Sequence, residues 1–153
     1  MPDLTFDPTD DQFVRKVGDF EIEYEDVFHM NNLYELVYEW LQENDFVSLD
    51  GKDDKYETLY KQKEDGDIRF HHIWWRAQKF PNDSDYYKYV MLFDYQTIAL
   101  GDTKVDYKGQ QMKTNKGDII MRCRTYVVLD YKQKWRNHWF LSLVQNWFWT
   151  YLF

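Results

Sequence analysis

Cysteine is almost absent from this 153-residue sequence, which contains only Cys123. A single cysteine excludes a disulfide within the chain and is typical of a protein from a reducing compartment. The HExxH, paired-cysteine and EF-hand patterns of common metal sites are missing, and so are glycine-rich phosphate-binding loops. The sequence therefore predicts neither a metal ion nor a cofactor.

Long hydrophobic runs are also missing. The longest apolar-rich stretch lies near the C-terminus and spans about fifteen residues, whereas a membrane-crossing helix needs about 20. Four polar residues interrupt this stretch: Ser142, Gln145, Asn146 and Thr150. The N-terminal residues show neither the basic region nor the apolar core of a signal peptide. We therefore expect a cytoplasmic protein without a transmembrane segment.

Positive charge is scarce, since 19 basic residues face 27 acidic ones and the net charge is −8. The field of such a chain repels nucleic-acid phosphates and anionic lipid, so nucleic acid is not an expected partner. The best candidate for a local basic patch is formed by Lys132, Lys134 and Arg136. Three charges in front of a helix are more typical of a solvated helix start.

Aromatic residues are abundant at 20% of the chain, including seven Trp and thirteen Tyr. Together with 44% hydrophobic and 30% charged residues, this composition indicates a folded protein with large contact surfaces. Residues 1–18 are acidic and contain Pro2 and Pro8, which predicts a flexible N-terminal arm. Residues 19–153 then form a single domain of ordinary size.

The first elements predicted are a strand and an amphipathic helix. From Asp19, apolar residues alternate with glutamates, as in a strand with one solvated face. Asn32 and Glu35 resemble a capping box, and apolar residues follow at helical spacing, which predicts a helix over about 32–44.

A series of strands joined by tight turns follows. Asp65-Gly66 is the strongest hairpin signal, because glycine adopts the positive φ of a primed turn. Further turns are predicted at Gly101-Asp102 and Lys108-Gly109, and Gly117 is predicted to open the last strand. The predicted strands cover 56–63, 68–79, 86–100, one or two short strands within 103–113, and 117–129.

The last nineteen residues, 135–153, predict a long C-terminal helix, with Asp130 and Gln133 as its capping pair. On a helical projection, His138, Ser142, Gln145 and Asn146 form a narrow polar stripe, and apolar residues cover most of the remaining surface. So wide an apolar arc needs a concave sheet around it, or a ligand or second subunit in addition.

The element order predicts an α+β domain, with a curved antiparallel sheet of six or seven strands wrapping the long C-terminal helix. This layout resembles the helix-grip superfamily, which includes Bet v 1, START and polyketide-cyclase-like domains. The resemblance implies a space between sheet and helix that often holds an apolar ligand and sometimes an active site. Fold analogy alone does not establish a function.

The first functional hypothesis is non-catalytic binding of a hydrophobic or aromatic small molecule in that space. The sequence of strand 68–79 does not determine which of its two faces points inward. The candidate ligand-binding residues are His72, Trp74, Arg76, Tyr87, Tyr89, Phe93, Tyr95, Met121, Phe140, Val144 and Trp147. A fully packed aromatic core without a vacancy explains the same pattern equally well.

Two other functions remain open. The aromatic C-terminal helix favours self-assembly or binding to another protein, because Trp and Tyr are frequent interface anchors. A cyclase-like or hydrolase-like enzyme would use His72, Arg76 or Asp94 for acid-base chemistry, although no catalytic spacing supports it. His71 and His72 do not predict a metal site, because neighbours in a strand point to opposite faces.

Overall fold

The computed structural model describes residues 6–10, 12–49 and 55–152. Part of the predicted N-terminal arm lies outside these ranges. The described part of the chain contains one antiparallel sheet of five strands in the order β1-β5-β4-β3-β2. The strands are β1 (Val14–Phe28), β2 (Glu57–Asp65), β3 (Ile68–Lys79), β4 (Tyr87–Tyr107) and β5 (Gln110–Leu129).

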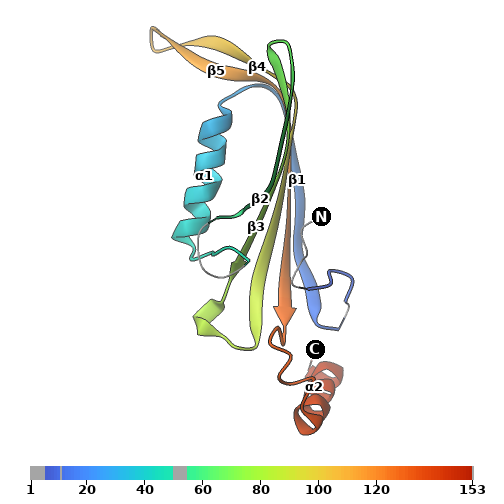
Figure 1. Cartoon of the computed structure of the whole chain (residues 1–153). Helices are drawn as coiled ribbons and strands as arrows, with labels where there is room; N and C mark the ends of the chain where they lie inside the picture. Colours follow the sequence, from blue (N-terminus) through green and yellow to red (C-terminus); the bar gives the residue numbers. More distant parts are fainter. Residues whose placement is uncertain (1–5, 11, 50–54, 153) are drawn as a thin grey trace.

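Two helices and one short 3-10 turn complete the described part of the fold. Helix α1 (Met30–Glu43) lies along one face of the sheet, and α2 (Trp139–Leu152) lies beyond the end of the sheet opposite the β4–β5 turn (Figure 1). The turn η1 (Pro81–Asp83) connects β3 to β4. Among the described residues, neither helix is long and apolar enough to cross a membrane.

The predicted wrapping of a sheet around the C-terminal helix is wrong. The helix on the concave side of the sheet is α1, and α2 is a fourteen-residue helix outside it (Figure 1). Asp130 accepts the backbone N–H groups of Trp135 and Arg136, at 3.1 and 2.9 Å, so it caps a turn rather than a helix. Residues 131–138 thus form an irregular connection, which shortens the predicted helix.

The predicted number of strands is also wrong, because the expected turn at Gly101 does not occur and Gly117 lies within β5 instead of opening a strand. Strands β4 and β5 continue past both glycines and pair as one long hairpin, with a register shift between Ile98 and Gly101. A Cβ atom at Gly117 would lie 2.9 Å from the Ala99 carbonyl oxygen. These glycines therefore permit a bulge and a close backbone approach, which are alternative uses of glycine in strands.

The other predicted elements are close to the structure. Gly66 and Gly109 have φ values of 63° and 80°, as tight turns between β2 and β3 and between β4 and β5 require. Helix α1 starts two residues before the predicted position, because His29 acts as its N-cap and its Nδ1 accepts the Asn32 N–H at 3.2 Å. Strand β1 begins at Val14, within the region predicted as a flexible arm, and pairs there with Val128.

The main core lies between α1 and the sheet. Leu41 is completely buried and packs with odd-numbered residues of the central strands, because alternate strand residues point to the same face. This cluster contains Met30, Leu41, Phe46, Tyr56, Ile73, Trp75, Ala77, Phe93, Tyr95, Leu100, Ile119 and Cys123. A smaller cluster of Val14, Val90, Leu92, Tyr126 and Val128 lies on the opposite face.

Candidate functional site

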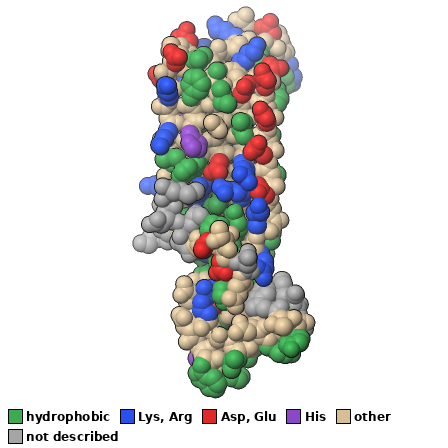
Figure 2. Space-filling view, turned by 90° about the vertical axis from the view of Figure 1, so that its right-hand side faces the viewer, with side chains coloured by type: hydrophobic (Ala, Val, Ile, Leu, Met, Phe, Trp, Pro, Cys, Tyr) green, Lys and Arg blue, Asp and Glu red, His purple; other side chains and the backbone are tan. Residues whose placement is uncertain are grey.

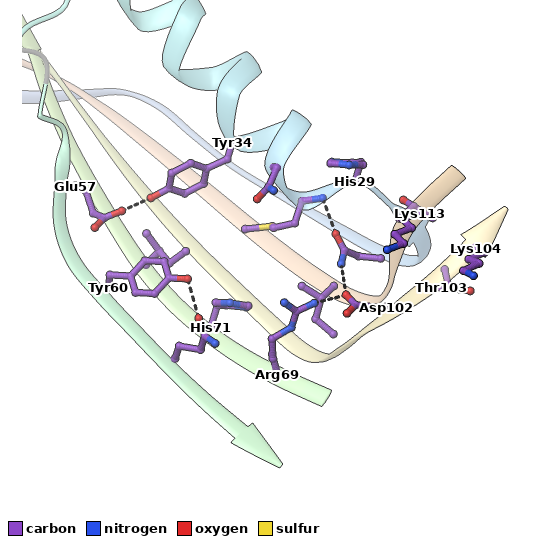
Figure 3. Close-up of a pocket in the computed structure, with 17 residues that line it drawn as sticks. His29, Tyr34, Glu57, Tyr60, Arg69, His71, Asp102, Thr103, Lys104 and Lys113 are labelled. Carbon is purple, nitrogen blue, oxygen red and sulfur yellow. Dashed lines mark hydrogen bonds and ion pairs between the residues drawn. The ribbon is translucent and has the colours of Figure 1, made fainter. Parts of the chain in front are cut away.

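A cleft of about 730 Å³ opens between the N-terminal half of α1 and the sheet. Its walls come from the start of α1, from β2 and β3, and from the extended β4–β5 hairpin (Figure 3). Apolar and aromatic side chains, including Met30, Tyr34, Tyr60, Ile73 and Leu100, alternate with charged groups around it. The volume is in the range of small-molecule sites, which combine apolar walls with a few polar groups.

A chain of hydrogen bonds connects the start of α1 to the sheet at one end of the cleft (Figure 3). The backbone N–H of Met30 donates to the Asn115 side-chain oxygen at 3.1 Å, and the Asn115 amide donates to Asp102 at 3.1 Å. Asp102 also forms an ion pair with Arg69 from β3. This chain fixes the helix start relative to β3, β4 and β5, so the cleft mouth is organised without a ligand.

Tyr34 organises the opposite part of the cleft. Its hydroxyl donates to the Glu57 carboxylate and accepts a hydrogen bond from Trp75 Nε1 at 2.7 Å. Burial and the neighbouring Glu57 carboxylate raise the pKa of Tyr34, because both disfavour a phenolate. The Tyr34 hydroxyl therefore remains protonated at neutral pH. In this neutral form it donates the hydrogen bond that connects α1 to Glu57 on β2.

His71 lines the centre of the cleft. Thr97 Oγ1 accepts the His71 backbone N–H at 2.9 Å and lies 2.7 Å from the ring Nδ1. Nδ1 is thus occupied by Thr97, which leaves Nε2 to interact within the cleft. Burial, followed by the positive charge of Arg69, lowers the pKa of His71. His71 is therefore neutral at physiological pH.

The lowered pKa of His71 predicts acid sensitivity of the fold. Below the ordinary histidine pKa of 6.5, the unfolded chain binds a proton at this position before the folded protein does. The free energy of unfolding should therefore fall as the pH drops from neutral to about 5.5. We expect the variant His71→Gln to show a smaller loss, measured by urea unfolding at both pH values. If His71→Gln lost as much free energy of unfolding on acidification as the wild type, His71 would not be the cause of the acid sensitivity.

One end of the cleft is positively charged. Lys104 and Lys113 both line it and face each other directly across β4 and β5. Like charges in directly opposed positions destabilise a strand pair, unless an anion lies between them. The positive end of the α1 dipole faces the same region, because Met30 and Asn31 also line the cleft. This end is therefore suited to a negatively charged group.

Comparisons with protein-family models, with curated proteins and with solved structures found no match. Within the described ranges, no group of three or more His, Cys, Asp or Glu side chains is positioned to hold a metal ion.

The predicted ligand-binding residues do not come together in one site, and none of them lines the cleft. Phe93 and Tyr95 are buried in the core beneath α1, and Met121 packs against it. Tyr87 and Tyr89 lie half-buried near the start of β4. The Tyr95 hydroxyl has no hydrogen-bond partner among the described residues, and burial raises its pKa. Phe140, Val144 and Trp147 are exposed on α2.

The remaining predicted residues lie on the sheet face away from α1. Trp74 Nε1 donates to His72 Nε2 at 2.9 Å, and Arg76 forms an ion pair with Asp94 at 3.3 Å. The groups considered for acid-base chemistry are thus distant from the cleft. The face of β3 that points inward carries His71, Ile73 and Trp75 instead.

The sequence analysis assigned none of the cleft residues to a site, because they come from five separate segments of the chain. One signal was present: His71 shares the odd-numbered alternation of Ile73, Trp75 and Ala77, which are all apolar. A histidine in line with three buried apolar positions indicates a polar group facing the core side. The predicted helix also contained Tyr34, although its role was not predicted.

Proposed function

We propose that this protein binds an aromatic small molecule with an anionic group in the cleft between α1 and the sheet. The observation that carries the proposal is the division of the cleft into an aromatic part and a positive end. Tyr34, Tyr60 and Ile73 line one part, and Lys104 and Lys113 lie at the other. Aromatic side chains provide large contact surfaces, and paired ammonium groups favour a carboxylate or sulfonate.

The proposal keeps the ligand-binding function expected from the sequence and changes its location. A site between the sheet and the C-terminal helix is ruled out by the position of α2 (Figure 1). The anionic group is an addition, since the composition alone favoured an apolar or aromatic ligand. The proposal includes a cytoplasmic location, which is supported by the single, buried Cys123.

Binding should be tested with a panel of aromatic carboxylates and sulfonates, each paired with an uncharged analogue such as 1-naphthylacetate and its amide. We expect the anionic members to raise the melting temperature more than their neutral analogues, because only they interact with the lysine pair. Isothermal titration calorimetry would then give the dissociation constants. A panel in which no compound binds would overturn the proposal.

Lys104→Glu and Lys113→Glu test the positive end of the cleft. Each change replaces an attraction by a repulsion, and we expect it to weaken binding of the anionic ligand about tenfold. The neutral analogue should bind equally to all variants. Lys63→Glu is the matched control, because it makes the same charge change on β2 but lies outside the cleft lining. Equal weakening by the control would contradict a specific role of the lysine pair.

A further inference from the structure

Helix α2 has its polar and apolar sides reversed relative to a helix that packs on its own domain. Gln145 is only 3% exposed and donates to the Tyr86 hydroxyl at 2.9 Å, and Gln12 donates to Asn146 at 3.3 Å. The side facing away from the domain carries Trp139, Leu143, Trp147 and Tyr151, which are 75%, 61%, 56% and 71% exposed. The helix thus directs polar groups inward and large apolar groups outward.

The outward residues form a continuous surface. Trp139, Leu143, Trp147 and Tyr151 recur every four residues, which places them along one side of the helix. Phe140 and Val144 extend this surface, and the Trp147 and Tyr151 rings are 5.8 Å apart. Figure 2 shows hydrophobic side chains gathered at the α2 end of the molecule. A contiguous exposed apolar surface of this kind indicates a binding surface.

The charge distribution favours a lipid bilayer as the occupant of this surface. Residues 137–153 contain no Asp, Glu, Lys or Arg. The preceding residues 131–136 contain three basic and no acidic residues, so all 27 acidic residues lie at or before position 130. The C-terminal segment therefore has a net charge of +3 and the rest of the chain −11, which is the sign that anionic headgroups attract.

Two of these bases form ion pairs with acidic residues. Lys132 forms an ion pair with Asp85, and Arg136 is 3.2 Å from Asp130. These two ion pairs cancel two of the three positive charges of residues 131–136, so the attraction to anionic headgroups is weaker than the net charge of +3 suggests. The glutamates of β1 begin at Glu21, about 20 Å along the strand from Val14, beyond the Debye length of about 8 Å at physiological salt. Asp10 lies nearer to α2, because it accepts the backbone N–H of Gln12, whose side chain contacts Asn146. Membrane binding is therefore expected to depend mainly on the apolar side of α2.

The composition and position of α2 fit the membrane interface. Trp and Tyr are enriched where headgroups meet acyl chains, because their rings are apolar and their N–H or O–H groups are polar. An apolar segment of about fourteen residues is typical of an interfacial helix rather than a spanning one. Because α2 lies beyond the end of the sheet, a flat surface can reach it without meeting α1 or β2 (Figure 1).

A second copy of the chain fits the surface less well. One side of a fourteen-residue helix is about 21 Å long and about 10 Å wide. That is small beside the about 800 Å² per partner of a standard protein interface. A symmetric contact would also bring two positively charged segments together. We propose that α2 lies in the interface of a lipid bilayer, with its outward aromatic side inserted and its polar side bound to the domain.

The proposal should be tested by co-sedimentation of the full chain with vesicles of phosphatidylcholine and of phosphatidylcholine with phosphatidylserine. We expect binding to both, tighter to the mixture, with only the additional binding sensitive to salt. Leu143→Ser combined with Trp147→Ser should lower the partition coefficient at least about tenfold. Both positions are exposed, so circular dichroism and the melting temperature should be unchanged.

Ile22→Ser is the matched control, because Ile22 is a half-exposed apolar residue on β1, far from α2. It should leave vesicle binding unchanged. The proposal would be overturned if the protein bound neither type of vesicle. So would a dimer in native mass spectrometry, without lipid, that the Leu143→Ser and Trp147→Ser variant dissociates, because a second copy would then cover the surface.

Discussion

Replacing Trp75 by alanine should lower the free energy of unfolding by about 3–5 kcal/mol, the largest effect expected from a single core substitution in this protein. Trp75 is 2% exposed and lies at the centre of an aromatic cluster. Its ring centroid is 4.4 Å from that of Tyr34, 5.5 Å from Tyr95 and 6.1 Å from Tyr56. Alanine would leave a large cavity among rings that cannot collapse into it.

The same substitution should also affect the cleft. Trp75 Nε1 donates to the Tyr34 hydroxyl, so alanine removes one of the two hydrogen bonds of that hydroxyl as well as the ring contact with Tyr34. Urea unfolding followed by circular dichroism measures the loss of stability. Trp139→Ala is the matched control, because Trp139 is the most exposed tryptophan among those described, and we expect it to change stability by less than about 0.5 kcal/mol. Similar losses for both variants would contradict the assigned core.

Replacing Asp94 by asparagine should destabilise the protein by about 3 kcal/mol, through a charge left without its partner. The Asp94 carboxylate lies 3.3 Å from Arg76 and 3.0 Å from Arg124, so it compensates two guanidinium groups. Arg76 is only 1% exposed, and burial lowers its pKa despite the neighbouring Asp94. Asparagine preserves the shape of Asp94 and removes only the charge.

Arg76→Met provides the informative comparison for this prediction. It removes the buried cation while retaining an unbranched side chain, and similar replacements of buried ion pairs are often neutral. We therefore expect Arg76→Met combined with Asp94→Asn to be more stable than Asp94→Asn alone. Thermal unfolding of the two single variants and the double variant would measure this coupling. Strictly additive effects would show that Arg76 and Asp94 do not depend on each other.

Glycines have two different structural roles in this protein. Gly66 and Gly109 were predicted in turns and occur there, because both adopt positive φ at the end of a strand pair. Gly101 was also predicted in a turn and Gly117 at the start of the last strand, but they lie within β4 and β5. The difference arises from tertiary contacts. Gly117 allows the backbone of Ala99 and Leu100 to approach, and no local pattern distinguishes this use from a turn.

The candidate site shows a similar division. The alternation in β4 places Phe93 and Tyr95 on one face, since strand period is a local property. The helix that covers that face was not predicted correctly. Both predicted helices have an apolar side that can pack on a sheet. The prediction placed the more apolar C-terminal helix there instead of α1. Burial was thereby inferred from hydrophobicity, whereas α2 exposes Trp139 and Trp147.

The sequence by itself determined the local elements of this protein: the amphipathic helix after the first strand, the hairpin at Asp65-Gly66 and the alternation along the strands. These follow from backbone preferences and from side-chain period, which act over a few residues. Only the tertiary structure decided which helix covers the sheet and which residues surround the cleft. Both depend on contacts between segments far apart in the chain, such as Asn115 with Met30 and Gln145 with Tyr86.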